Sequence, residues 1–208
     1  MPNVVNTTRR VACSGLHIRT DRSLLADFSW QHAPGGIAWL LGSNGSGKSS
    51  LLRVLAGWQA PTEGTVTWAG APAGRRYYFN PAMSAGADLR VADFMALMHT
   101  LAPPFQDEDL AALYPESVGP NRRFGQLSTG EAKRILLWAL LRPAPGPLLL
   151  DEPYEHLSRD AKDALTRLLR ARAADDVVII ATNQDVPEHA TDTLLTFDGD
   201  RIEVRHAG

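Results

Sequence analysis

Short runs of apolar residues alternate along the chain with segments in which apolar positions recur every three or four residues. The runs of uninterrupted apolar character are Ile37 to Leu41, Leu148 to Leu150 and Val177 to Ile180. Such runs are typical of strands that are buried on both faces of a sheet. The segments with helical periodicity are Lys48 to Ala56, Glu131 to Leu141 and Arg159 to Arg172. Buried strands that alternate with helices predict an α/β core around a mainly parallel sheet.

Two regions differ from this alternating pattern. Leu16 to Ile18 and Leu24 to Trp30 are short apolar stretches that predict an N-terminal sheet. In the middle of the chain, Val91 to Leu101 and Asp107 to Tyr114 have a helical pattern, and Pro103-Pro104 separates them. We therefore expect a helical subdomain, over approximately residues 85–140, inserted into a single domain that spans residues 1–208.

Composition supports a globular protein and excludes several other classes. Of the 208 residues, 44% are hydrophobic and 21% are charged, which excludes wholesale disorder. The net charge of −2 argues against a dedicated nucleic-acid-binding protein, which usually carries a basic excess. Cys13 is the single cysteine, so an intrachain disulfide is impossible. We see no secretory signal and no apolar run long enough to span a bilayer, so we expect a soluble chain.

A glycine-rich stretch after the first buried strand matches the phosphate-loop pattern G-x-x-x-x-G-K-[ST]. It consists of Gly42, Ser43, Asn44, Gly45, Ser46, Gly47, Lys48 and Ser49, and Ser50 follows it in the predicted helix. The glycines allow consecutive backbone N–H groups to surround phosphate oxygens, and the helix N-terminus adds partial positive charge. Lys48 would reach the β- and γ-phosphates, and the Ser49 hydroxyl would bind Mg²⁺. The alternative is a chance glycine-rich turn, which the strand–loop–helix context disfavours.

Two acidic residues follow another buried strand, since Leu148 to Leu150 leads directly into Asp151 and Glu152. In a parallel sheet, ligands bind at the carboxyl ends of the strands. Asp151 would therefore hold Mg²⁺, and Glu152 would orient or deprotonate the water that attacks the γ-phosphate. A solvated turn is the alternative, and the nearby phosphate loop makes it the weaker one.

A capping box precedes the helix that contains Glu131. Ser128 occupies the N-cap position of Leu-Ser-Thr-Gly-Glu, and Glu131 follows three residues later. By itself this pattern predicts only the start of a helix. Its place in the chain is more informative, because it lies between the phosphate loop and the Asp151-Glu152 pair.

The three motifs together, GSNGSGKS, LSTGE and LLLDEP, resemble those of the ATP-binding cassette (ABC) ATPases, whose signature reads L-S-G-G-Q. The similarity covers essentially the whole chain. Ser128 and Gly130 keep the signature, whereas Thr129 and Glu131 depart from it. Within the family, the short length and the stretch GSNGSGKSSLLRVLAGWQAPTEGTVTWAG are most like the haem-exporter-type subunits of cytochrome c maturation. The resemblance implies a P-loop NTPase core with an N-terminal antiparallel β-subdomain and an inserted α-helical subdomain.

The resemblance also implies ligands and partners. ATP and Mg²⁺ are the expected cofactors. Two cassettes, most simply two copies of this chain, would pair head to tail. Ser128, Gly130 and the N-terminus of their helix would then contact the γ-phosphate held by the other subunit. A separate transmembrane permease would dock near Pro81 to Pro104 and would keep the chain at the cytoplasmic face of the cell membrane. No nucleic acid is expected as a partner.

Several positions depart from the family pattern. Asn80 stands where the family usually has a glutamine that binds Mg²⁺, and asparagine is one methylene shorter. Asn183 stands where the family usually has a switch histidine, and its amide can donate to a γ-phosphate oxygen but carries no positive charge. Neighbouring Gln184 could compensate. Ser158 replaces the aspartate of the family's D-loop and is a good N-cap for the next helix. Because Glu152 is retained, we expect ATP hydrolysis that is slow or that depends on the membrane partner.

Other interpretations stay open. Arg19 to Arg22 stands where the family often stacks adenine on an aromatic ring, and an arginine could stack there, although a solvated turn is slightly favoured. A regulatory cassette with weak or no hydrolysis would suit Asn80 and Asn183. A soluble ABC protein that acts on DNA or ribosomes usually has two cassettes or a long coiled coil, and a small P-loop kinase would not need the LSTGE motif. The tryptophans are expected in the core, at positions Trp30, Trp39, Trp58, Trp68 and Trp138.

Overall fold

The computed structural model describes residues 9–19, 24–70, 76–101, 108–115, 117–142, 146–198 and 201–207. They form two compact units. The first comprises Met1–Tyr78, Gly146–Glu152 and Arg170–Gly208, and the second comprises Phe79–Pro145 and Pro153–Leu169. The expected helical subdomain limits of about 85 and 140 stay a prediction.

An antiparallel sheet of three strands begins the first unit. Its order is β2-β1-β4, with β1 at Arg10–Arg19, β2 at Leu24–His32 and β4 at Glu63–Ala69. Side chains of β1 alternate between buried and exposed, and Val11, Cys13, Leu16 and Ile18 point into the core. This alternation is what a half-buried antiparallel sheet requires. The expected N-terminal antiparallel β-subdomain is confirmed.

A second sheet of the order β5-β6-β7-β3-β8-β9 carries the strands with continuous apolar character. Its strands are β3 (Ile37–Leu41), β5 (Tyr77–Phe79), β6 (Leu148–Asp151), β7 (Val178–Thr182), β8 (Thr193–Asp198) and β9 (Arg201–His206). The pairs β6/β7, β7/β3 and β3/β8 are parallel, and β9 pairs antiparallel with β8. The expected α/β fold with a mainly parallel sheet is therefore confirmed. The carboxyl ends of β3, β6 and β7 share one edge of this sheet.

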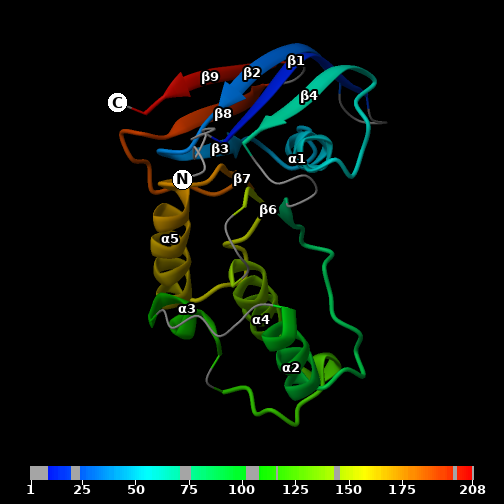
Figure 1. The fold of residues 1–208 in the computed structure, drawn as a ribbon, viewed down its shortest axis with the longest axis vertical. Helices are drawn as coiled ribbons and strands as arrows, with labels where there is room; N and C mark the ends of the chain where they lie inside the picture. Colours follow the sequence, from blue (N-terminus) through cyan, green and yellow to red (C-terminus); the bar gives the residue numbers. More distant parts are fainter. Residues whose placement is uncertain are drawn as a thin grey trace, which may run out of the picture. The chain divides into compact units, whose positions relative to one another are not determined.

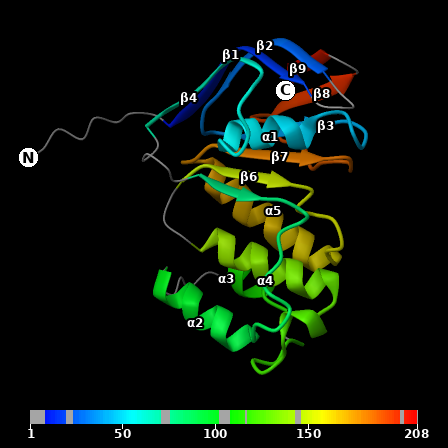
Figure 2. The ribbon, with the colours of Figure 1, turned by 90° about the vertical axis from the view of Figure 1, so that its right-hand side faces the viewer.

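Helix α1, at Lys48–Ala56, lies between the two sheets of the first unit in both ribbon views (Figures 1 and 2). Leu51, Leu52 and Leu55 are fully buried in a core that also takes side chains from both sheets. The expectation for the tryptophans is right for Trp39, which is fully buried, and wrong for Trp58, which is 66% exposed. Trp58 follows the end of α1, and its ring lies nearly perpendicular to the buried ring of Tyr78, with the ring centroids 5.1 Å apart.

Helices dominate the second unit. They are α2 (Val91–Leu101), α3 (Glu108–Leu113), the 3₁₀ turn η1 (Phe124–Gln126), α4 (Thr129–Leu141) and most of α5 (Arg159–Ala173), whose last turn belongs to the first unit. The rings of Phe94 and Phe124 meet edge to face at 5.1 Å, and Arg134 Nε donates to the Leu113 carbonyl at the end of α3. The predicted Pro103-Pro104 break lies outside the described residues. Within those residues, no helix is both long and apolar enough to cross a membrane.

Candidate functional site

The loop between β3 and α1 has the backbone that the phosphate-loop motif predicts. Gly42, Gly45 and Gly47 have φ angles of 151°, 85° and 104°, which residues with a Cβ rarely adopt. A Cβ on Gly42 would also lie 3.0 Å from the Cβ of Phe197 and 3.0 Å from Ser46 Oγ. All three glycines are therefore needed for the turn, and Gly42 is needed for close packing as well.

Lys48 is bent back over this loop. Its side chain is buried, and its ammonium group donates to the carbonyl oxygens of Gly42 at 2.7 Å and Ser43 at 3.0 Å. Burial lowers the pKa of Lys48 from its ordinary value, and the charges of Glu152 and Asp151 act in the opposite direction. The ammonium group thus lies beside the loop and near both carboxylates, in a position to bind a phosphate group that the loop holds.

Two serines, one in the loop and one in the first turn of α1, differ in their hydrogen bonds. Ser46 Oγ is buried and has no hydrogen-bond partner among the residues that the structure describes. Buried hydroxyl groups are nearly always paired, and a phosphate oxygen would supply the missing partner. Ser50 Oγ instead accepts a hydrogen bond from Arg53 within α1. The orphaned Ser46 hydroxyl therefore fits a loop that is completed by a phosphate ligand.

The two carboxylates lie at the end of β6, as predicted. Asp151 is 4% exposed. Glu152 has a φ of 47°, in the left-handed region that side chains usually avoid, so the chain turns sharply immediately after the strand. Its N–H donates to Ala181 O at 2.9 Å, and its Oε2 accepts from Thr182 Oγ1 at 3.0 Å. Both bonds tie Glu152 to the neighbouring strand β7.

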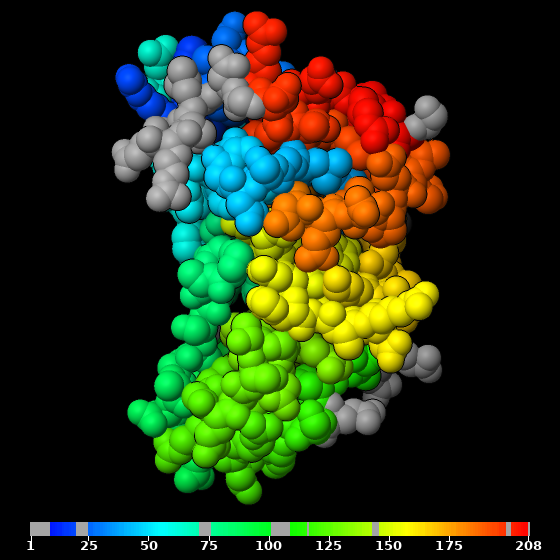
Figure 3. Space-filling view, turned by 180° about the vertical axis from the view of Figure 1, so that it is seen from behind, coloured from blue at the N-terminus to red at the C-terminus, as the bar shows by residue number. Residues whose placement is uncertain are grey.

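Asn183 follows β7 and lies against the phosphate loop. Its Nδ2 donates to Asn44 Oδ1 at 3.0 Å. A cavity of about 290 Å³ opens here, with Gly42, Ser43, Asn183 and Gln184 in its wall. In the space-filling view the orange surface after β7 borders the light-blue surface around the loop (Figure 3). The first unit thus brings Lys48, Asp151, Glu152 and Asn183 to one edge of the sheet.

Sequence reasoning missed two of these contacts. The bond from Thr182 to Glu152 and the bond from Asn183 to Asn44 both join residues far apart in the chain. Thr182 follows the apolar run Val177 to Ile180 almost directly. A threonine at the end of a buried strand needs a hydrogen-bond partner for its hydroxyl group, so the sequence does indicate that Thr182 makes such a contact. No local pattern indicates that Asn44 pairs with Asn183.

The predicted signature residues lie in the second unit, at the start of α4. The capping box is confirmed: Ser128 Oγ accepts from Glu131 N at 3.2 Å, and Glu131 Oε2 accepts from Ser128 N at 2.8 Å. The Ser128 hydroxyl also donates to Glu131 at 2.9 Å, and Arg122 forms an ion pair with the same carboxylate at 3.2 Å. Hydrogen bonds from the backbone and hydroxyl of Ser128 hold the pKa of Glu131 below its ordinary value.

Gly130 meets a steric requirement of the same unit. A Cβ at this position would lie 2.7 Å from the carbonyl oxygen of His156, a distance that real Cβ atoms essentially never show. His156 itself has a φ of 61°. The segment that follows Glu152 thus passes directly over the first turn of α4, and only a glycine fits beneath it.

Three further predicted positions complete the comparison with the sequence. Asn80, in the second unit, accepts a hydrogen bond from Ala82 N through its side-chain oxygen at 2.9 Å, so it closes a turn. Ser158 Oγ accepts from Ala161 N at 3.4 Å, as an N-cap of α5 does. Of the stretch proposed near adenine, Arg19 ends β1, and residues 20–22 lie outside the described residues.

Comparisons with known proteins agree with this arrangement. A family model described as ABC transporter matches residues 25–155. The cytochrome c biogenesis ATP-binding export protein CcmA of Rhodospirillum rubrum is 39% identical over 198 residues, covering 88% of this chain and 83% of that protein. The zinc import ATP-binding protein ZnuC of Halorhodospira halophila is 37% identical over 191 residues, covering 89% and 72%. A solved ATP-binding subunit of an ABC transporter has the same fold, with a TM-score of 0.72 at 16% identity over 94% of this chain and 89% of that chain.

The matched residues include the phosphate loop, the signature and the carboxylate pair. Proteins of this family bind ATP, couple its hydrolysis to transport, dimerise and pair with permease subunits. The chain belongs to the ABC transporter family, and it is an ATP-binding subunit of such a transporter.

Proposed function

We propose that this subunit binds MgATP at the phosphate loop and hydrolyses it with Glu152 as the residue that activates water. The observation that carries the proposal is the position of Glu152, whose carboxylate is bonded to Thr182 of β7 at the edge of the sheet where Lys48 of α1 and Asn183 also lie. A carboxylate near a lysine at the carboxyl edge of a parallel sheet suits proton transfer from a water next to a phosphate.

Each residue of the loop has a proposed task. The backbone of Gly42 to Gly47 would surround the phosphates, and Lys48 would exchange its bonds with the loop carbonyls for phosphate oxygens. Ser49, Asp151 and Asn80 would hold Mg²⁺, which neutralises phosphate charge when it is bound. The oxygen-only donor set of these three side chains suits that ion.

We propose slow or partner-dependent hydrolysis because of the two asparagines. Asn183 already donates its amide to Asn44, so contact with a γ-phosphate requires that this bond be exchanged. Its amide also supplies no positive charge to the phosphate. Asn80 is engaged in a turn with Ala82. Each contact adds a step before a productive site can form.

The pairing of cassettes is proposed from the signature. Ser128 and Gly130 would meet the ATP that a second copy of this chain holds, with the partial positive charge of the N-terminus of α4 directed at the phosphate. The Ser128 hydroxyl is held by Glu131, and Arg122 offsets the negative charge of that carboxylate.

A cavity in the second unit is the proposed docking site of the permease. It has a volume of about 500 Å³, and its wall includes Phe79, Met83, Ala87, Phe124 and Leu136. Met83 is 37% exposed. Lys133 and Glu155 also line the cavity, but most of its wall is apolar. A mainly apolar wall with an adaptable methionine suits a helix of the membrane subunit that presents apolar side chains. This docking would hold the chain at the cytoplasmic face of the cell membrane.

We propose export of the cytochrome c biogenesis type as the transport process. CcmA of Rhodospirillum rubrum supports this choice through its identity of 39% and through the 83% of its length that this chain covers. The import protein ZnuC has similar identity but is covered over 72%. The transported substrate would be recognised by the permease.

The first experiment compares ATP binding and hydrolysis in wild type, Lys48→Ala and Glu152→Gln. We expect Lys48→Ala to weaken ATP binding by at least about tenfold, because the phosphates lose their buried cation. Glu152→Gln should still bind ATP and should lose about a hundredfold or more in turnover. Lys162→Ala and Glu155→Gln are matched controls outside the loop. Equal turnover in wild type and Glu152→Gln, with ATP bound in both, would contradict the proposal and would favour a regulatory cassette.

A further inference from the structure

Thr182, the last residue of β7, is a buried side chain to which the motifs assign no task. It is 1% exposed. Its Oγ1 accepts a hydrogen bond from Gln184 N at 3.1 Å and lies 3.0 Å from Glu152 Oε2. A hydroxyl group has a single hydrogen, and an ionised carboxylate only accepts. Because the Glu152 carboxylate can only accept, the hydroxyl hydrogen of Thr182 is directed at Glu152. The oxygen of the same hydroxyl accepts the hydrogen bond from Gln184 N–H.

Glu152 needs such a support because its own chain segment does not orient it. It stands immediately after the end of β6, with a φ of 47°. Its backbone N–H is fixed to Ala181 O. Three rotatable bonds separate that backbone from the carboxylate, and each adds freedom that lowers the fraction of productive orientations. The bond from Thr182 fixes the far end of this side chain to the same strand that fixes its backbone.

The two anchor points come from adjacent residues of β7. Ala181 lies opposite Asp151 in the parallel pair β6/β7, so the pairing of the strands places Thr182 level with Glu152. Lys48 on α1 and Asp151 on β6 act on the same region by charge, whereas Thr182 acts through a directed bond. Only a directed bond selects one orientation of the carboxylate.

We propose that Thr182 is a positioning residue for ATP hydrolysis, which it supports by holding the Glu152 carboxylate toward the phosphate loop. The inference rests on the proposed role of Glu152. It assigns to the residue before Asn183 an effect on turnover that leaves ATP binding unchanged. The phosphates would still be held by the loop backbone and by Lys48, neither of which contacts Thr182 through a bond described above.

The test compares Thr182→Val, which removes the hydroxyl but keeps the branched shape, with Thr182→Ser, which keeps the hydroxyl. We expect kcat to fall about tenfold in Thr182→Val and to stay within about threefold of wild type in Thr182→Ser, as for loss of one hydrogen bond to a charged group. KM for ATP should be unchanged in both variants. Melting temperatures, measured beside the rates, show that each variant is folded at the assay temperature. If the isolated chain turns over too slowly, the rates are measured on the complex recovered with its membrane partner.

A double substitution separates positioning from a general structural effect. In the Glu152→Gln background, Thr182→Val should lower the residual rate no further, because the carboxylate that Thr182 holds is already gone. An equal fractional loss in both backgrounds would overturn the inference. So would equal kcat values for Thr182→Val and wild type, or a loss in Thr182→Ser as large as in Thr182→Val. If Glu152→Gln itself has the same turnover as wild type, the proposed role of Glu152 in hydrolysis is contradicted, and this outcome is distinct from a failure of the Thr182 inference.

Discussion

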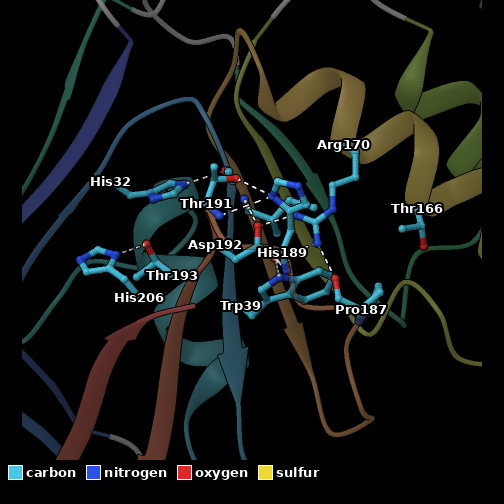
Figure 4. A network of polar contacts seen from close by, with 12 residues as sticks. His32, Trp39, Thr166, Arg170, Pro187, His189, Thr191, Asp192, Thr193 and His206 are labelled. Atoms are coloured by element: carbon cyan, nitrogen blue, oxygen red, sulfur yellow. Dashed lines mark hydrogen bonds and ion pairs between the residues drawn. The ribbon is translucent and has the colours of Figure 1, made fainter. Parts of the chain in front are cut away.

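Asp192 is fully buried immediately before β8, and its carboxylate bonds to residues of several elements (Figure 4). It accepts from Ile37 N at 3.0 Å, Trp39 Nε1 at 2.8 Å and His189 N at 3.1 Å, and Arg170 forms an ion pair with it. Burial raises the pKa of Asp192, but the hydrogen bonds from Arg170, Ile37 and Trp39 outweigh burial and hold it below its ordinary value. This carboxylate fixes the start of β3, the strand that leads into the phosphate loop.

Replacement of this charge should therefore destabilise the chain. We expect Asp192→Asn to lower the free energy of unfolding by about 3 kcal/mol, since the variant leaves the partly buried Arg170 without its counter-ion. Urea unfolding monitored by circular dichroism measures the difference. Asp198→Asn, at an exposed aspartate that ends β8, serves as the control and should change stability by about 0.5 kcal/mol or less.

The same carboxylate gives the stability a defined pH dependence. Because the pKa of Asp192 is lower in the folded state, its contribution is complete above the ordinary aspartate pKa and is lost as the pH falls through the folded value. Wild type should therefore lose its advantage over Asp192→Asn below about pH 4. An advantage that stays constant from pH 7 to pH 3 would contradict this origin.

At the residue scale, the sequence predicts the local structure of a single motif, but it does not predict the hydrogen bonds that connect residues of two different motifs. The spacing from Gly42 to Ser49 dictates a phosphate loop, because those residue types in that order serve one local geometry. The bond between Thr182 and Glu152 depends on the alignment of β6 with β7, and the bond between Asn44 and Asn183 depends on the neighbouring pair β7/β3. Such alignments are set by the whole sheet.

Helix α4 illustrates how a single element is specified. Its capping box satisfies the Ser128 and Glu131 N–H groups at once, and Arg122 pairs with the Glu131 carboxylate. The apolar residues that follow, with Ile135 and Leu137 fully buried, then fix the helix in the second unit. Because the start signal and the apolar pattern both indicate the same helix, its position and its type could be predicted.

Loss of the cap should be measurable without nucleotide. We expect Ser128→Ala to lower the free energy of unfolding by about 1 kcal/mol, because the first turn of α4 loses its side-chain acceptor. Ser158→Ala, which removes a longer bond of 3.4 Å at the start of α5, should cost less. Thermal and urea unfolding give both values. A larger loss for Ser158→Ala would show that the bond lengths do not rank the two caps.

Element boundaries were harder to predict where polar residues end a buried strand. The apolar run Val177 to Ile180 predicts a strand, and β7 extends to Thr182. This polar residue can end a buried strand because its hydroxyl group donates a hydrogen bond to Glu152. β1 runs over Arg10–Arg19, well beyond the predicted Leu16 to Ile18. Its pairing shifts between Cys13 and Leu16, which interrupts the simple alternation of apolar and polar residues.

For the whole molecule, the chain carries its motifs on two compact units. The phosphate loop, Asp151, Glu152 and Asn183 belong to the first unit, whereas Asn80, Ser128 and Gly130 belong to the second. Composition and alternation of elements predicted the fold class, since these depend on averages over many residues.

The proposed docking cavity gives a prediction at this scale. Met83→Glu should reduce recovery of the permease with the chain from detergent-solubilised membranes by at least about tenfold, because a charge enters an apolar interface. ATP binding by the isolated variant should equal that of wild type. Val204→Glu, at an apolar residue of β9 that is 44% exposed, is the control and should leave recovery unchanged. Normal recovery with Met83→Glu would place the docking site elsewhere.

The strand order also bears on how the chain is made. Ile37 lies opposite Val178, and Ala38 lies opposite Thr193, so β3 finds both of its neighbours only near the C-terminal end of synthesis. Until then the apolar segment Ile37–Leu41 has no strand beside it, and such unpaired edges are prone to aggregate. Closure of loops this long is slow. We therefore expect the nucleotide site to form only after β7 and β8 have been synthesised.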